Sequence, residues 1–200
     1  MFAICSDLEG VWVPEVWVNV AQKTGIEDLK LTTRDINDYD VLMKRRIKIL
    51  KEHNLKIQDI QNVISKIEPL EGALEMLNWL RENMLTTIVS DTFEEFAQPL
   101  MKQLNMPALF CNKLSIAPDG TVIGYNLRQP DQKRCVTNAM KSLEYKIIAF
   151  GDSYNDISML QTADYGILFR PPQNVKDDYP SLPVINSYSE MKQTILDIIK

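Results

Sequence analysis

Phe2-Ala3-Ile4-Cys5-Ser6-Asp7-Leu8-Glu9-Gly10 opens the chain with an apolar run that ends in acidic residues and a glycine. The run over residues 2–6 predicts a short buried β-strand, and the Asp-Leu-Glu-Gly that follows predicts a turn. In extended backbone, residues two apart share a face, so Asp7 and Glu9 can converge on one ligand. We therefore expect a site at the carboxyl end of this first strand.

Strands and helices alternate in the second half of the chain. Strands are predicted at residues 85–89, 109–110, 146–150 and 165–169, and helices at 94–104, 132–143, 156–161 and 187–200. Such alternation is typical of a parallel sheet flanked by helices. Residues 114–116 and 121–125, joined by Pro118-Asp119-Gly120, predict a hairpin, because Asp-Gly readily adopts the positive φ angles of tight turns.

The segment between the first strand and residue 70 has helical periodicity instead. Apolar residues recur at helical spacing up to Gly25, and amphipathic helices are predicted at 38–50 and 57–67. We expect an α/β core made of residues 1–13 and 71–200, with a helical cap over residues 14–70. An insert placed after the first strand lies over the carboxyl ends of the strands, where open α/β sheets bind ligands.

The composition indicates an ordinary globular protein that acts on a small molecule. The 200 residues are 45% hydrophobic and carry a net charge of -5, which gives no attraction to nucleic acid or to an anionic membrane. Asp7 and Glu9 interrupt the apolar N-terminus, so it predicts neither a signal peptide nor a membrane span. The three cysteines are far apart and odd in number, which favours reduced thiols and a cytoplasmic location.

Polar residues stand at four predicted strand ends or in the loops beside them. They are Asp7 and Glu9, then Ser90-Asp91-Thr92, then Lys133, and then Gly151-Asp152-Ser153-Tyr154-Asn155-Asp156. Each group alone could be an ordinary turn or helix cap, but their agreement in place and order predicts one site. The single histidine, His53, lies in a polar helix end, so carboxylates must carry any reaction.

The motif at 151–156, together with Asp7-Leu8-Glu9-Gly10-Val11, resembles the haloacid dehalogenase superfamily. Within it the chain looks most similar to the phosphoserine phosphatases, and especially to the phosphoserine:homoserine phosphotransferase branch. The resemblance implies a Rossmann-like core, an aspartyl-phosphate mechanism and Mg²⁺ as cofactor. L-Phosphoserine is the substrate that it implies, with water or L-homoserine as acceptor.

The resemblance also implies roles for the acidic residues. Asp7 would be the nucleophile, and Glu9 the general acid and base. Mg²⁺ would be held by Asp7, Asp152 and the backbone carbonyl of Glu9, with Asp156 nearby to orient ligands or water. Most superfamily phosphatases have Asp where this chain has Glu9, so the proton would be delivered from a different position.

The remaining assignments concern the two ends of the substrate. Ser90, Lys133, Asn155 and the amides of Asp91 and Thr92 are the phosphate and substrate ligands that the resemblance implies, with Arg134 as the alternative cation to Lys133.

Arg46 lies on the apolar stripe of its predicted helix and aligns with a carboxylate-binding arginine of the family. An internal ion pair or a snorkelling side chain is the alternative for Arg46. Glu15 would bind the substrate ammonium, or else merely complement a helix N-terminus.

Two other functions are compatible with these residues. One is hydrolysis of a different small phosphate monoester, and the other is a non-catalytic phosphate-binding or regulatory module. The predicted cap and Glu9 favour the enzyme, because a binding module needs neither a substrate cover nor a proton donor.

Overall fold

A mostly parallel sheet forms the centre of the computed structural model, which describes residues 1–32, 35–36 and 38–200. Among these residues the sheet has seven strands in the order β4-β3-β2-β1-β5-β6-β7. Their bounds are β1 (Phe2–Ser6), β2 (Leu85–Phe93), β3 (Ala108–Ile116), β4 (Val122–Asn126), β5 (Lys146–Gly151), β6 (Tyr165–Phe169) and β7 (Val184–Ile185). Every neighbouring pair is parallel except β3 and β4, which form an antiparallel hairpin.

Helices precede and follow the strands along the chain. They are α1 (Val16–Thr24), η1 (Glu27–Lys30), α2 (Tyr39–Glu52), α3 (Ile57–Ile64), α4 (Ala73–Asn83), α5 (Glu94–Gln103), α6 (Gln132–Ser142), η2 (Tyr154–Asp156), α7 (Ile157–Thr162), α8 (Gln173–Asp178) and α9 (Tyr188–Ile199). Among the described helices, none combines the length and the apolar character that crossing a bilayer requires.

The two faces of the sheet bury different sets of side chains, because successive residues of a strand point to opposite faces. On β1, Ile4 joins a large cluster with the apolar faces of α4, α5 and α9. Ala3 and Cys5 point the other way and pack with α6, α7 and α8. Helices on both faces explain why β1 and β5 are continuous apolar runs.

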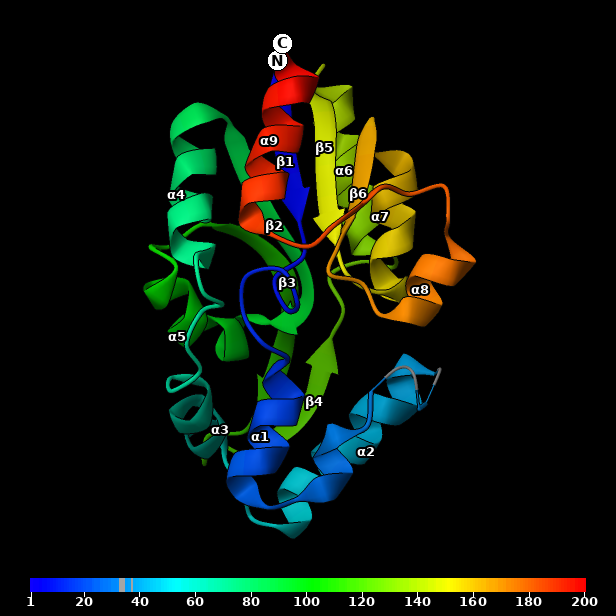
Figure 1. Ribbon diagram of the computed structural model, residues 1–200. Helices are drawn as coiled ribbons and strands as arrows, with labels where there is room; N and C mark the ends of the chain where they lie inside the picture. The colour runs from blue at the N-terminus through cyan, green and yellow to red at the C-terminus, as the bar shows by residue number, and fades with distance from the viewer. Residues whose placement is uncertain (33–34, 37) are drawn as a thin grey trace.

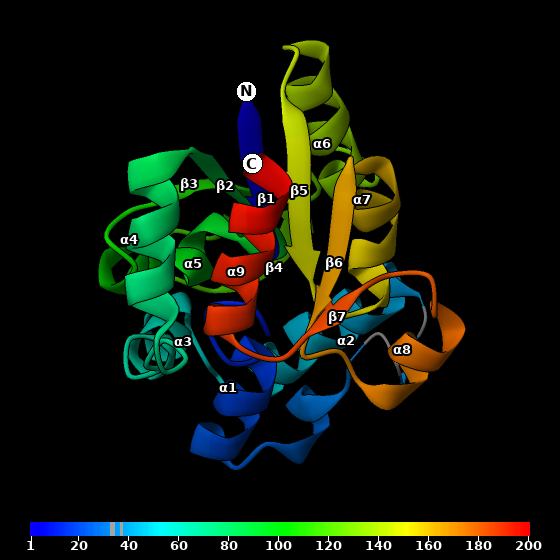
Figure 2. The same cartoon turned by 45° about the horizontal axis from the view of Figure 1, so that its top comes forward.

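The helices α1, α2 and α3 lie beyond the carboxyl ends of the strands (Figures 1 and 2). The β3–β4 hairpin reaches them: Ile57 N donates to Gly120 O at 2.9 Å, and Lys56 Nζ lies 2.8 Å from Asp119 Oδ2. Tyr125 Oη on β4 also donates to Asp40 Oδ1 on α2 at 2.7 Å. The segment that follows β1 is therefore joined to the sheet by side chains as well as by its two chain connections.

The predicted elements are present, but two strands differ in extent and several short elements are additional. β2 continues through Phe93, so Ser90, Asp91 and Thr92 lie within the strand and not after it. The two pieces predicted at 109–110 and 114–116 form one strand, β3. η1, η2, α8 and β7 were not predicted, because they are too short to show a periodic pattern.

Candidate active site

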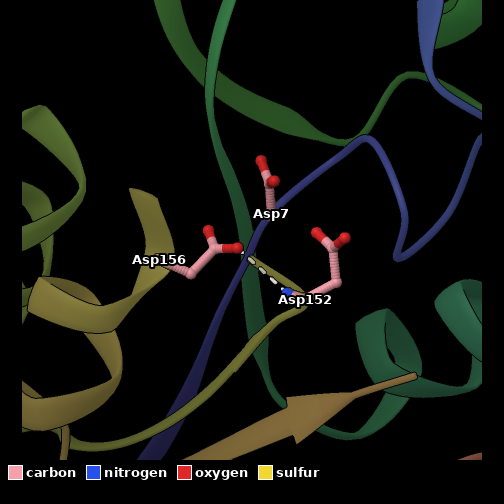
Figure 3. A group of neighbouring side chains, drawn as sticks. All are labelled: Asp7, Asp152 and Asp156. Carbon is pink, nitrogen blue, oxygen red and sulfur yellow. Dashed lines mark hydrogen bonds between the residues drawn. The ribbon is translucent and has the colours of Figure 1, made fainter. Parts of the chain in front are cut away.

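Three aspartates meet at the carboxyl ends of the two central strands (Figure 3). Asp7 follows β1, Asp152 follows the neighbouring β5, and Asp156 ends η2. All three are buried, and one carboxylate oxygen from each lies within 4.8 Å of the others. Backbone bonds fix the arrangement: Asp7 N donates to Phe150 O at 2.9 Å, and Asp152 N donates to Asp156 Oδ2 at 2.9 Å.

Two glycines allow these carboxylates to approach the backbone. Gly10 has φ +77°, and a Cβ there would lie 2.5 Å from the Cγ atom of Asp152. A Cβ on Gly151 would collide with the side chain of Asp156. The glycine of each motif is therefore required by close packing, and at Gly10 also by the left-handed backbone.

Lys133 is the buried counter-charge of the cluster. Its side chain is 1% exposed, and its Nζ atom lies 2.6 Å from Asp156 Oδ1 and 3.0 Å from Asp7 Oδ1. Burial alone would lower the pKa of Lys133, but Asp156 and Asp7 outweigh burial and raise it well above its usual value. The neighbouring Arg134 is exposed and pairs with Asp131, so Lys133 is the cation that reaches the site.

The donor set fits a hard divalent cation. Asp7 Oδ1 is buried and accepts no well-oriented hydrogen bond from the described residues, although Lys133 Nζ is near. Burial raises the pKa of Asp7 well above its usual range; Lys133 opposes this, and Asp156 and Asp152 add to it. Asp7 and Asp156 share the Lys133 ammonium, and Asp152 adds a third buried carboxylate beside them, so a bound cation would relieve their repulsion.

A cavity opens beside the carboxylate cluster, and Asp7 and Asp152 line it. Ser90, Asp91 and Thr92, at the end of β2, line the same cavity. The Ser90 hydroxyl accepts from Thr92 N at 3.3 Å and remains able to donate to a ligand. Asn155 donates from Nδ2 to Asp91 Oδ2 at 3.0 Å, and Gln132 donates from Nε2 to Asp91 Oδ1 at 3.1 Å. The structure thus brings the four predicted motifs together through one network.

Glu9 is half-buried and lies in the same cavity as Asp7. Its Oε2 atom accepts from Val16 N at 2.8 Å, at the start of α1. Burial, together with the nearby charge of Glu15, raises the pKa of Glu9 to about 8. A pKa shifted in this direction favours the protonated form of the carboxyl group near neutral pH.

Arg46 points into this cavity from α2 and is 6% exposed. Its guanidinium stacks on Trp17 at 4.5 Å from the ring centre and donates from Nη2 to Leu31 O at 2.7 Å. Its Nε atom is buried and has no hydrogen-bond partner among the described residues, and none of their ion pairs includes Arg46. Burial lowers the pKa of Arg46 to about 10, although Glu9 acts in the opposite direction.

Glu15 lines the cavity as well, from the residue just before α1, and its side chain is exposed. The cavity has a volume of about 230 Å³ and includes an apolar wall. That wall consists of Trp17, Val18, Leu42 and Phe93, which the sequence analysis did not assign to the site. Their apolar character makes them indistinguishable from core residues in a sequence.

Gln132 is the polar residue that the sequence reasoning missed. It is 2% exposed and donates to both Ser90 O, at 2.8 Å, and Asp91 Oδ1. At the start of a helix a glutamine is typical of a solvated position, and only the tertiary structure brings it against β2.

A mostly parallel α/β sheet that gathers buried carboxylates and a lysine at the carboxyl ends of its strands is the arrangement of a ligand-binding α/β protein. The chain belongs to the haloacid dehalogenase-like hydrolases, whose family model matches residues 3–164. The superfamily expected from the motifs is thereby confirmed.

Two relatives match nearly the whole chain. One is the phosphoserine phosphatase ThrH of Pseudomonas aeruginosa, 56% identical over 96% of this chain and 94% of its own length. The other is a phosphoserine phosphatase of Pseudomonas syringae pv. tomato, 55% identical over 96% of this chain and 81% of its own length. A solved phospho-aspartyl intermediate analogue of phosphoserine phosphatase has the same fold, with a TM-score of 0.79 and 23% identity over 96% of this chain and 98% of that one.

Proposed function

We propose that the protein is a Mg²⁺-dependent phosphoserine phosphatase that can also pass the phosphoryl group to a hydroxyl amino acid such as homoserine. The observation that carries this proposal is a single cavity lined by Asp7, Glu9 and Asp152 and also by Glu15 and Arg46. The aspartates suit phosphoryl transfer, whereas a guanidinium and a second carboxylate suit a zwitterionic amino acid. The similarity to two phosphoserine phosphatases supports the same substrate.

We assign residues 14–70 to a cap and residues 1–13 with 71–200 to the catalytic core. In support, α1 and α2 contribute Trp17 and Arg46 to the cavity, while the sheet contributes Asp7, Ser90 and Asp152. The cavity thus lies where the two segments meet. A cover of this kind excludes water from the reacting phosphorus.

Asp7 is the proposed nucleophile. One of its carboxylate oxygens attacks phosphorus, the bond between phosphorus and the seryl oxygen breaks, and an aspartyl phosphate forms. The Glu9 carboxyl group gives its proton to the departing oxygen, so serine leaves neutral at that position. In the second step Glu9 takes a proton from water or from the acceptor hydroxyl group, and the oxygen so activated attacks phosphorus. The bond between phosphorus and the Asp7 oxygen breaks, which frees Asp7 and releases phosphate or the phosphorylated acceptor.

We propose Mg²⁺ as the metal, held by Asp7, Asp152 and the backbone carbonyl of Glu9. Asp156 stays beside the site, where it accepts from Asp152 N and Ser153 N. The ion would neutralise the negative charge that accumulates when a carboxylate meets a phosphate. Oxygen-only donors of this kind match the preference of Mg²⁺.

The phosphoryl oxygens would be bound by Ser90, Lys133 and Asn155 with the amides of Asp91 and Thr92. At the amino-acid end, Arg46 would bind the substrate carboxylate in bidentate fashion, and Glu15 would bind the ammonium. The partnerless Nε of Arg46 supports this assignment, since a buried donor without an acceptor is costly.

Homoserine is the acceptor that the resemblance to the phosphotransferase branch implies beside water. The side chain of Glu9 is one methylene longer than the aspartate usual in the superfamily, so it would deliver the proton from a different position. We also propose that the enzyme works in the cytoplasm. Its three cysteines are free thiols, two of them buried, which suits a reducing compartment.

The direct test is incubation with L-phosphoserine and Mg²⁺, with and without L-homoserine. Free phosphate and phosphohomoserine are followed separately, with Asp7→Asn as the control. We expect phosphate release in both mixtures and phosphohomoserine only in the second. Equal activity in Asp7→Asn would contradict the mechanism, and phosphate without phosphohomoserine would reduce the proposal to a phosphatase.

Arg46→Lys separates phosphoserine from other phosphate monoesters. The lysine keeps the positive charge but loses the bidentate geometry, so kcat/KM for phosphoserine should fall about 10- to 100-fold, as expected for lost charged hydrogen bonds. Hydrolysis of p-nitrophenyl phosphate should change little. The matched control is Arg45→Lys, one residue earlier, where an exposed guanidinium pairs with Asp28 at 3.3 Å. Equal losses on both esters would point to a different substrate.

A further inference from the structure

Asp91 places a carboxylate beside the residues proposed to bind phosphate, where a negative charge should weaken the binding of an anion. Its side chain is 38% exposed. It lines the active-site cavity and also a neighbouring cavity of about 670 Å³. A carboxylate that weakens phosphate binding must contribute to the site in another way.

The contacts of the carboxylate suggest that role. Oδ1 accepts from Gln132 Nε2 at 3.1 Å, and Oδ2 accepts from Asn155 Nδ2 at 3.0 Å. Lys133 Nζ lies 3.9 Å from Oδ2. One side chain on β2 therefore contacts the first turn of α6 and the loop of the acidic motif.

Both amide groups have their orientation fixed from the other side. Gln132 Nε2 also donates to Ser90 O at 2.8 Å, and Asn155 Oδ1 accepts from Ser153 Oγ at 2.6 Å. Asp91 consequently faces two N–H donors. A carboxylate can accept from both, whereas a carboxamide can accept from only one and must present its own N–H to the other.

Side chains on both sides hold the first turn of α6. Asp131, which precedes the helix, has φ 48° and accepts from Ser158 Oγ on α7 at 2.7 Å and from Arg134 Nε. Gln132 and Lys133 are the next two residues, and the bonds from Gln132 to Ser90 O and Asp91 attach this turn to β2. The same turn directs Lys133 to Asp7 and Asp156.

We propose that Asp91 is a positioning residue for phosphoryl transfer, which holds Asn155 and the first turn of α6 so that Lys133 is fixed relative to Asp7 before substrate binds. The inference rests on the proposed phosphatase activity and adds a residue that acts through others. Preorganised donors stabilise a transition state without reorganising during the reaction. Asp91 therefore favours the chemical step at some expense to phosphate affinity.

The test compares Asp91→Asn and Asp91→Ala with the parent, on phosphoserine and on p-nitrophenyl phosphate. We expect kcat to fall about 10- to 100-fold, as is typical when a supporting contact of a site is lost. The loss should be similar on both esters, because the phosphoryl end is common to them. Asp91→Asn should be the slower variant, since its amide N–H faces another donor.

One further measurement separates positioning from general damage. Inhibition by inorganic phosphate should stay unchanged or become stronger in both variants, because a repelling charge is gone. Asp197→Asn is the matched control: its carboxylate also accepts from a glutamine, Gln193, and a lysine, Lys200, but on α9. It should keep the parent kcat.

Retention of kcat within about two-fold in both variants would overturn the inference. So would a parallel loss of kcat and phosphate affinity in both variants. If the parent cleaves p-nitrophenyl phosphate but not phosphoserine, the proposed substrate is wrong, while the effect of Asp91 is still measured on the artificial ester.

Discussion

Removing the charge of Lys133 should strongly destabilise the metal-free protein. Lys133→Met keeps most of the length of the side chain but leaves Asp7 and Asp156 buried without their cation. Breaking a buried ion pair on one side costs about 3–5 kcal/mol. Because a chain of this size loses about 2–4 °C in Tm for each kcal/mol, we expect a fall of roughly 6–20 °C.

The assays are thermal unfolding, which gives the Tm, and urea unfolding, which gives the free energy of unfolding; both are run in the presence of a chelator and repeated with Mg²⁺. The difference in the free energy of unfolding between the parent and Lys133→Met should become smaller as Mg²⁺ is added, because the ion can supply the missing positive charge. A ligand at 100 times its Kd stabilises by about 2.7 kcal/mol. The Mg²⁺ titration thus reports whether the carboxylate cluster binds the ion.

The matched control is Lys113→Met. Lys113 also pairs with a carboxylate, Glu94, at 3.2 Å, but its side chain is 63% exposed. Exposed pairs contribute about 0–1 kcal/mol, so this variant should unfold almost as the parent does. A loss below about 1 kcal/mol in Lys133→Met, or equal losses in both variants, would refute the reasoning.

Three other perturbations test the site and the stability of the core. Gly10→Ala should raise the Mg²⁺ concentration needed for half-maximal activity, because its Cβ would displace the Asp152 carboxylate; an unchanged Mg²⁺ dependence would contradict the packing argument. Chelation of divalent metal should abolish phosphate release, and Mg²⁺ should restore it; activity that survives chelation would exclude a required metal. Burial raises the pKa of Asp164, but hydrogen bonds from Ile147 N and Lys141 outweigh burial and lower it. The ionised Asp164 carboxylate therefore stabilises the fold above about pH 4, and this stabilisation is lost as the pH falls further. Acidification should therefore lower the Tm of Asp164→Asn less than that of the parent. If the Tm of both proteins fell in parallel with pH, Asp164 would not contribute to the pH dependence of stability.

The location of the aspartates was predictable because it depends on local pattern. Asp7 and Asp152 each follow a continuous apolar strand, and two neighbouring parallel strands must end at the same edge of the sheet. Their meeting within one cluster follows from those two facts. Which of Lys133 and Arg134 is the cation of the site could not be predicted. Adjacent residues of a helix point in different directions, and a single sequence does not show which of the two directions faces the site.

β3 shows why strand limits were harder to predict than strand existence. Asn112 and Lys113 interrupt its apolar pattern, which led to two separate predicted pieces. In the structure Asn112 is buried, donates to Asp91 O at 3.1 Å and accepts from Arg128 N at 3.0 Å. These long-range hydrogen bonds satisfy the polar side chain of Asn112 within the strand, and the local sequence pattern does not predict them.

The central position of β1 has a consequence for how the protein forms. β1 is synthesised before its two neighbours, which begin at Leu85 and Lys146. At ordinary rates of synthesis, about 5–20 residues per second, β1 must wait several seconds for β5. Until then its apolar side chains lack one edge partner, and Asp7 cannot meet Asp152. The proposed nucleophile is thus synthesised well before the residues that complete its site.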